Sequence, residues 1–341
     1  MFKITTTFKE ITTTSKRLAL LVLLFFTFNS MLCASEITLI TNGSWQDHSI
    51  WPGSQLPGVS DDVVIPAGIT IDLSGTIEVK SITVHGILRS QGEGIDLKAQ
   101  WIFVAGNNAL FEVGTASQPY EDAKCLITLT GDNENAGMMG NKFIGAMNGG
   151  RVELHGAEKI SWTHLGANVN VGANQITMSE AVDWEVGDEI VIVSSRLDWN
   201  EAEKRAISAI SGDGLTIALN TNLNYPHVGS VETYTRSTDN KAWTADLRAE
   251  VGLLTHNVTV QGDAQSENNG FGGHIMAMMG STINASSIEL YRMGQKGISG
   301  KYPWHWHLLH EFGKDQYFKN SSVHRSFNRA ITIHGTSYAT V

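Results

Sequence analysis

Hydrophobic and polar residues alternate along most of the chain, in short runs that end at glycine or asparagine. Residues 61–75, 79–92 and 150–162 contain such runs, each about five to seven residues long. A period of two is the side-chain period of a β-strand. Helical periodicity is confined to residues 199–207, a segment that could equally be a loop leading into a strand. The pattern therefore predicts an all-β protein.

The spacing of the runs favours stacked coils over a sandwich. Many runs end at a turn and restart about 20 to 30 residues later with a similar pattern, which is typical of a parallel β-helix. Residues 283–294 and 317–328 are similar in sequence, since both contain Ser-Ser followed by a β-branched residue. Residues 186–193 and 212–220 look instead like hairpin strands of a small β module.

The N-terminus reads as a secretory signal over residues 1–34. Lys16 and Arg17 precede an apolar run at 18–28, which is too short to span a bilayer securely. Cleavage near Ala34 removes Cys33, so Cys125 remains as a small buried hydrophobic residue with no disulfide partner. We therefore expect a secreted or cell-surface protein without a membrane span in its mature chain.

The formal net charge of −10 disfavours nucleic acids and anionic polymers at long range, so an anionic ligand needs a local basic patch. The sequence has no nucleotide-binding loop, no Gly-x-Ser-x-Gly elbow and no His-Glu-x-x-His element. These absences argue against phosphoryl transfer, a serine esterase of the elbow type and a zincin protease. The oligomeric state is not indicated.

Several ordered blocks resemble a known family. Residues 51–73, 81–89 and 111–120 are similar to the G-eight domain in order and spacing. The second half is closer to the branch of the cell-migration-inducing hyaluronan-binding protein and the cell-surface hyaluronidase, in four blocks: 245–262, 271–279, 293–308 and 323–336. The resemblance implies a β-rich G-eight domain followed by the start of a right-handed parallel β-helix, with a glycan as ligand or substrate.

Two departures limit the comparison. Animal relatives insert a globular module between segments that match residues 161–165 and 184–188, whereas here about twenty residues join Leu165 to Trp184. Relatives also continue for further coils beyond the position of Val341, so we expect the last coils to be incomplete. The predicted domains are a signal at 1–34, a G-eight domain at 36–167, a small β module at 168–245 and β-helix coils at 246–341.

The stretch at 300–313, GKYPWHWHLLHEFG, carries the clearest candidate chemistry. In a strand His305 and His307 project from one face, about 6.6 Å apart, and a neighbouring coil can add a third residue. His274 and His334 are the candidates by register. Such imidazoles suit zinc or another divalent metal that polarises water or a sugar oxygen, with His305 and His307 as catalytic groups. The alternative is an aromatic packing ladder.

Other residues of the last coils could bind the ligand. His324, Arg325 and Arg329 supply cationic and hydrogen-bonding groups suited to the carboxylates of a uronic-acid polymer, or else form ordinary surface ion pairs. Trp304 and Trp306 could stack on sugar rings if exposed, although burial is the commoner outcome. His310 is expected in a loop, outside the site.

Asp246, Arg248 and Glu250 alternate onto one face. They form either an ion-pair ladder or a site in which Asp246 and Glu250 act as acid and base while Arg248 binds the ligand. The combined hypothesis is an exported protein that binds, and in the catalytic version depolymerises, a hyaluronan-like polysaccharide. The alternative is a non-catalytic extracellular structural or adhesion module in which the histidines are core residues.

Overall fold

The computed structural model describes residues 36–121 and 123–341. The predicted signal at 1–34, with Cys33, lies outside these residues. The described chain is almost entirely β-structure, which confirms the predicted all-β class; its one α-helix is the short α2 (Ser266–Asn269). Within the described ranges, no helix is long and apolar enough to cross a membrane. Cys125 is buried and free, and burial raises its pKa to about 12.

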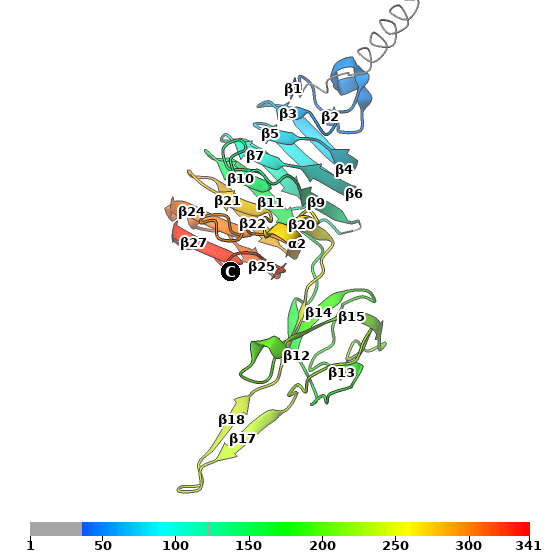
Figure 1. Ribbon diagram of the computed structural model, residues 1–341, viewed down its shortest axis with the longest axis vertical. Helices are drawn as coiled ribbons and strands as arrows, with labels where there is room; N and C mark the ends of the chain where they lie inside the picture. The colour runs from blue at the N-terminus through cyan, green and yellow to red at the C-terminus, as the bar shows by residue number, and fades with distance from the viewer. Residues whose placement is uncertain (1–35, 122) are drawn as a thin grey trace, which may run out of the picture. The chain divides into compact units, whose positions relative to one another are not determined.

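An eight-stranded sheet runs the length of the stack, and the neighbours in it pair in parallel (Figure 1). Its strands, in spatial order, are β1 (Glu36–Thr38), β3 (Asp62–Ile65), β5 (Ser81–Val84), β7 (Trp101–Ala105), β10 (Phe143–Met147), β21 (His274–Ala277), β24 (Trp304–His310) and β27 (Ile331–Thr336). Spatial order follows chain order because each coil lies on the one before it.

A second, eleven-stranded sheet forms another side of the coils and is also parallel. Its main path is β25 (Phe318–Lys319), β22 (Thr282–Ser286), β11 (Arg151–His155), β8 (Leu110–Val113), β6 (Ile87–Ala99), β9 (Cys125–Leu129), β20 (Val258–Gly262), β23 (Ile288–Tyr291) and β26 (Ser322–His324), with β2 (Gly43–Ser44) and β4 (Thr70–Glu78) beside it. Inward side chains from both sheets share one apolar core. Parallel strands of successive coils around a single core make the predicted parallel β-helix.

A separate antiparallel unit interrupts the stack. Its six-stranded sheet has the order β12 (Trp162–His164), β19 (Glu250–Leu253), β14 (Glu189–Ile192), β15 (Glu203–Ile210), β16 (Thr216–Leu219) and β13 (Gln175–Thr177). β17 (Val231–Thr235) and β18 (Ala242–Asp246) form a hairpin, and the unit has its own apolar core. The predicted strands at 186–193 and 212–220 are present as β14 and β16, but each pairs with β15 rather than with the other.

The segment 199–207 is not a helix of any length. It contains the single turn η3 (Trp199–Glu201), and Glu203 then begins β15. The alternative of a loop leading into a strand is therefore the better description. The strand is established by its pairing, since β15 forms antiparallel ladders with β14 on one side and β16 on the other.

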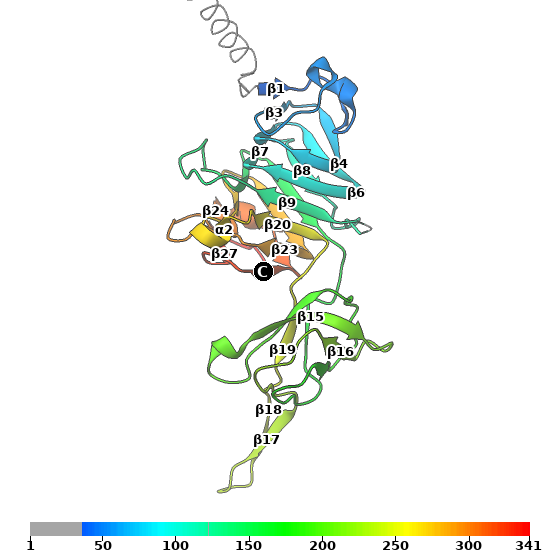
Figure 2. The ribbon, with the colours of Figure 1, turned by 45° about the vertical axis from the view of Figure 1, so that its right-hand side comes forward.

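The boundaries of the module differ from those expected at 168 and 246. β12 and β19 belong to the module's sheet, and the stack resumes at β20 (Figure 2). Coils before and after the module share the same two sheets. The chain leaves and re-enters the stack at one place, since Ala157 N donates to Asn257 Oδ1 at 2.8 Å. The regions predicted as two domains thus form one stack.

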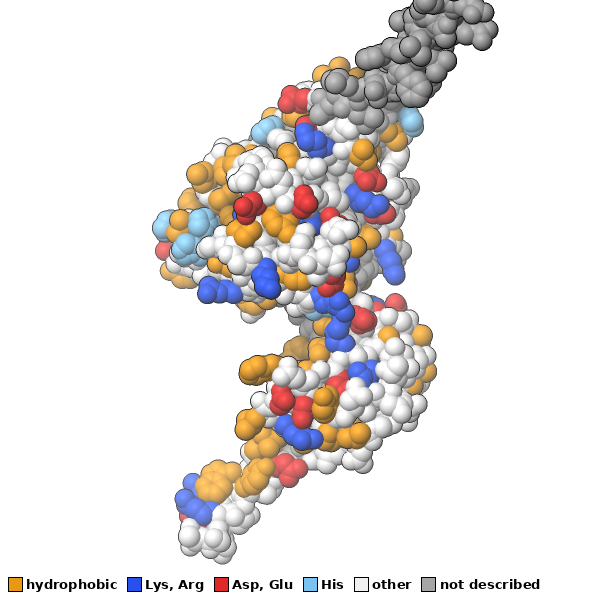
Figure 3. All heavy atoms as spheres, viewed as in Figure 1, with side chains coloured by type: hydrophobic (Ala, Val, Ile, Leu, Met, Phe, Trp, Pro, Cys, Tyr) orange, Lys and Arg blue, Asp and Glu red, His pale blue; other side chains and the backbone are white. Residues whose placement is uncertain are grey.

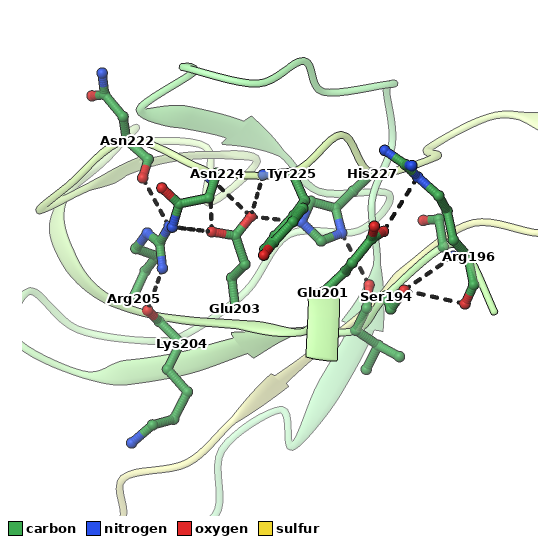
Figure 4. Close-up of polar contacts among 12 residues, drawn as sticks. Ser194, Arg196, Glu201, Glu203, Lys204, Arg205, Asn222, Asn224, Tyr225 and His227 are labelled. Carbon is green, nitrogen blue, oxygen red and sulfur yellow. Dashed lines mark hydrogen bonds and ion pairs between the residues drawn. The ribbon is translucent and has the colours of Figure 1, made fainter. Parts of the chain in front are cut away.

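A buried carboxylate organises the module. Glu203 accepts hydrogen bonds from the backbone N–H groups of Asn224 and Tyr225, at 2.8 Å and 2.9 Å, and contacts His227 at 3.2 Å and Arg205 (Figure 4). Burial alone would raise the pKa of Glu203, but these hydrogen bonds lower it overall. One ionised side chain on β15 therefore holds the loop that follows β16.

Candidate metal and ligand site

Strand β24 sends its tryptophans inward and its histidines outward. Trp304 and Trp306 are completely buried, with ring centroids 5.7 Å apart, and Trp306 Nε1 donates to Gln316 Oε1 at 3.0 Å. Trp304 and Trp306 therefore follow the second alternative, burial, and are not available to stack on sugars, because alternation places both rings in the core when the histidines face out. His305 and His307 share the outer face, as expected.

Strand β27 brings a third histidine to this face. His307 is paired in register with His334, whose Nδ1 lies 3.2 Å from His307 Nδ1. One nitrogen from each of His305, His307 and His334 lies within 4.8 Å of the others. His305 is buried, His307 is half-buried and His334 is exposed, so the trio opens to solvent on one side. Histidine side chains are visible on the surface beside β24 and β27 (Figure 3).

The deepest of the three rings has a fixed orientation. His305 Nδ1 lies 3.0 Å from the Gly300 carbonyl oxygen, so this nitrogen carries the proton and donates it. His305 Nε2 is buried and has no hydrogen-bond partner among the described residues. Burial lowers the pKa of His305 to about 4 and also lowers the pKa of His307. Both rings are neutral at pH 7, with a lone pair available at His305 Nε2.

The closest pair of nitrogens in the trio has the spacing expected of ligands to a metal ion of the zinc type. Zinc–imidazole bonds of about 2.0–2.1 Å in a tetrahedral arrangement place two ligand nitrogens about 3.3–3.4 Å apart, close to the separation of His307 and His334. The hydrogen bond from His305 to a backbone carbonyl is the usual support for a metal-bound imidazole. Three nitrogen ligands leave a fourth position for water or a sugar oxygen.

The predicted fourth ligand, His274, is not part of this group. In β21 the residue in register with His305 is Met276, so His274 lies one outward position earlier. His274 is fully buried, stacks on Phe143 at 5.8 Å and places Nε2 3.4 Å from Lys301 Nζ. Burial, followed by the charge of Lys301, holds its pKa well below the usual range. The register, which sequence spacing did not reveal, excludes it from the trio.

Gly300, which orients His305, was not anticipated. Gly300 has a φ of 84°, a conformation that favours glycine, and its carbonyl oxygen accepts the proton of His305. The glycine was visible in the sequence, but its role as a backbone acceptor depends on the turn. His310 ends β24 rather than lying in a loop, with a φ of 51°, and does not join the trio.

The basic residues of the last coil have different environments. Arg325 pairs with Glu267 at 3.0 Å, and His324 contacts Glu289 at 2.8 Å and is mostly buried. Arg329 instead lies over the ring of Tyr302, 6.0 Å from its centroid, and Tyr302 packs edge-on against His305 at 5.0 Å. Arg329 is thus separated from His305 by the ring of Tyr302, whereas Arg325 and His324 form local ion pairs.

The trio Asp246, Arg248 and Glu250 belongs to the antiparallel module. Arg248 binds Asp246 through two hydrogen bonds, of 2.9 Å and 2.7 Å, and these bonds lower the pKa of Asp246 to about 2. Glu250 lies in β19, in register with His164 of β12. The arrangement supports the ion-pair interpretation, because the guanidinium occupies both oxygens of Asp246.

Two protein families match the chain. The G8 domain matches residues 50–166, and the CEMIP beta-helix matches residues 270–341. Fibrocystin-L of Mus musculus is 32% identical over 342 residues, which cover 87% of this chain and 8% of that protein. A G8 domain-containing protein of Dictyostelium discoideum is 32% identical over 314 residues, covering 87% of this chain and 20% of that protein. The chain therefore spans a small part of these relatives.

Two solved structures show limited similarity to this chain. The tailspike gp61 of Pseudomonas phage phi297 is 13% identical with a TM-score of 0.24, and the match covers 71% of this chain and 40% of that one. The Gp54 tailspike of Acinetobacter baumannii phage AP22, solved with a capsular saccharide, is 9% identical with a TM-score of 0.25, covering 71% and 41%.

Proposed function

We propose, from the matches of residues 50–166 to the G8 domain and of residues 270–341 to the CEMIP beta-helix, that this chain is an exported protein that binds an extracellular polysaccharide. The ligand site is the outer face of β24 and β27. The observation that carries the proposal is the trio of His305, His307 and His334, with its nitrogens within 4.8 Å and an open side.

The polymer is of the hyaluronan type, with a carboxylate on alternate sugars. Arg329 lies on the far side of the Tyr302 ring from His305, and a guanidinium fork matches a carboxylate in geometry and charge. The Tyr302 ring contacts both the guanidinium of Arg329 and the ring of His305. The resemblance of residues 293–308 and 323–336 to the hyaluronan-binding branch agrees with this ligand class. Arg329 would therefore set where a uronate lies relative to the trio.

Depolymerisation is the catalytic version of the same proposal. A divalent metal such as zinc, if bound, would polarise a water molecule or a sugar oxygen. The chain's own contribution is to keep His305 neutral, to fix its ring through Gly300 and to hold a uronate at Arg329. The non-catalytic alternative, a structural or adhesion module, requires only the binding surface.

Binding is tested with hyaluronan, chondroitin and alginate oligosaccharides by calorimetry, using Arg329→Gln. We expect this change to weaken binding about tenfold or more, because it removes a charge-assisted contact of about 1.5–3 kcal/mol. Arg325→Gln is the matched control, since Arg325 pairs with Glu267 and its loss should leave affinity unchanged. Equal affinities in both variants would contradict the placement of the site.

Catalysis is measured as polymer size after incubation with and without added zinc. A fall in polymer mass that requires zinc and disappears in His307→Asn supports the depolymerase. Unchanged polymer size with intact binding supports the non-catalytic module.

A further inference from the structure

A small cavity lies over the outer face of the second sheet, away from β24 and β27. It has a volume of about 20 Å³, and its lining includes His155 of β11, Ser286 of β22, Lys319 of β25 and Thr115. Such a volume holds about one water molecule. His155 and Ser286 are both nine-tenths buried or more. Two polar side chains therefore converge on one enclosed space.

The register places these side chains next to each other. His155 is paired with Ser286 on adjacent parallel strands, which lie about 4.8 Å apart. Their neighbours Leu154 and Ala285 are also paired and are completely buried in the core. Because side chains alternate along a strand, His155 and Ser286 share the outward direction.

A carboxylate fixes the histidine. His155 Nε2 lies 3.0 Å from Glu153 Oε2, so its N–H donates to the carboxylate. Glu153 also accepts from Arg151 Nη2 at 2.8 Å and Asn284 Nδ2 at 3.1 Å. Burial would raise the pKa of Glu153, but these hydrogen bonds, first that of His155, lower it overall. The opposite ring nitrogen, Nδ1, is therefore the basic one.

One polar atom of each residue has no partner. His155 Nδ1 and Ser286 Oγ are buried and have no hydrogen-bond partner among the residues that the structure describes. An unpaired buried polar group costs about 1–3 kcal/mol. In structures without substrate, the distance between a nucleophile and its base is often greater than that of a good hydrogen bond. A carboxylate, an oriented imidazole and a hydroxyl correspond, in this order, to the orienting group, the base and the nucleophile of a catalytic triad.

We propose that Ser286, His155 and Glu153 form a hydrolytic site for short acyl esters, of acetyl size, carried on sugar hydroxyls. Ser286 is the nucleophile, His155 the general base and Glu153 the positioning residue. The cavity as it stands holds about one water molecule, so an acyl group would enter only with movement of the lining side chains, and only the shortest acyl chains would fit. The choice of a sugar as carrier rests on the proposed polysaccharide function, whereas the ester chemistry does not.

The reaction balances with water alone. Ser286 Oγ attacks the carbonyl carbon while His155 Nδ1 takes the hydroxyl proton. The tetrahedral intermediate expels the sugar hydroxyl, which receives that proton from His155, and leaves an acyl-serine. Water then attacks the acyl-serine, gives its proton to His155, and the carboxylic acid leaves as Ser286 recovers its hydroxyl. Lys319, in register with Ser286 and lining the cavity, supplies positive charge near the developing oxyanion.

Sequence motifs could not indicate this site. The Gly-x-Ser-x-Gly pattern marks a serine on a sharp strand-to-helix turn. Here the histidine and the carboxylate are two residues apart on one strand, and the serine comes from a strand more than a hundred positions later. Only the pairing of β11 with β22 brings the three together.

The full chain is tested with p-nitrophenyl acetate in the presence of EDTA, which removes any contribution from a metal at the histidine trio. Ser286→Ala and His155→Gln should lower the rate at least about 100-fold. Thr282→Ala is the control, because Thr282 lies on β22, faces the same way and does not line the cavity. For the positioning role, Glu153→Gln should lower kcat while KM stays the same.

A second readout does not depend on the variants folding. A fluorophosphonate probe should label Ser286 in the native wild-type chain, identified by peptide mass spectrometry, and should not label it after denaturation. No turnover above buffer together with no labelling of Ser286 would overturn the site and leave a buried structural network. Either result leaves the polysaccharide-binding test at β24 and β27 unaffected.

Discussion

The chemistry of the candidate metal site depends on which nitrogen each imidazole presents. Gly300 uses the Nδ1 proton of His305, and so Nε2 faces the trio with its lone pair. The same logic applies at His155, where Glu153 accepts a hydrogen bond from Nε2–H and Nδ1 has no partner among the described residues. In both cases a neighbouring oxygen acceptor, rather than the histidine itself, decides what the ring can do.

At the residue scale, Trp306→Ala should destabilise the fold by about 3–5 kcal/mol, because it empties a core position of a large buried ring. Phe312→Ala is the control: Phe312 is 66% exposed, so its loss should change stability by no more than about 0.5 kcal/mol. Urea denaturation measures both. If Trp306→Ala left the stability unchanged and abolished glycan affinity, Trp306 would be a ligand-binding residue and not a core residue.

At the element scale, the strands were predictable and their partners were not. Side-chain alternation along one strand depends only on adjacent residues, so the sequence alone places the histidines and tryptophans of β24 on opposite faces. The third ligand depends on register between coils, which selects His334 and passes over His274. The insertion of β12–β19 between two halves of one stack is likewise a long-range property, because Ala157 and Asn257 meet only in the fold. Local periodicity carries no information about such pairings.

The loop after β16 depends on the ionised form of Glu203. Glu203→Gln should lower stability at pH 7 by about 3 kcal/mol, since it weakens four contacts of a buried carboxylate. The pKa of Glu203 is lower in the folded state than its ordinary 4.5, so its stabilisation is complete above that value. It is lost as the pH falls through the folded pKa.

The difference between the wild type and Glu203→Gln should therefore be largest at neutral pH and shrink below about pH 4.5. Denaturation curves collected across this range provide the measurement. Glu189→Gln on β14 is the control, because that carboxylate is 43% exposed and contacts Lys204 at only 3.5 Å. If the difference in free energy of unfolding between Glu203→Gln and the wild type did not depend on pH, the charge of the carboxylate would not be what holds the loop.

At the scale of the whole molecule, the coils before and after the module form one folding unit. They share both sheets and one apolar core, while the module has a core of its own. Each coil of a stack is stabilised mainly by the adjacent coils. The coils beyond β11 should therefore depend for their stability on contacts with the preceding coils more than on contacts with the module.

Replacing residues 158–255 by a short Gly-Ser linker tests this organisation. The ends of the excised segment lie together, since Ala157 N and Asn257 Oδ1 are 2.8 Å apart. We expect a soluble β-rich chain with a single cooperative unfolding transition. Two separate transitions, or a chain that does not fold, would show that the module holds the two halves of the stack together.

The central claim is that His305, His307 and His334 hold one divalent metal ion. The direct test is elemental analysis of the purified chain after incubation with zinc and extensive dialysis, beside His305→Asn, His307→Asn and, as the control, His310→Asn. We predict one zinc per chain in the wild type and in His310→Asn, and loss of most of the metal in the other two variants. No bound metal in the folded wild type, or equal metal content in all four proteins, would contradict the claim.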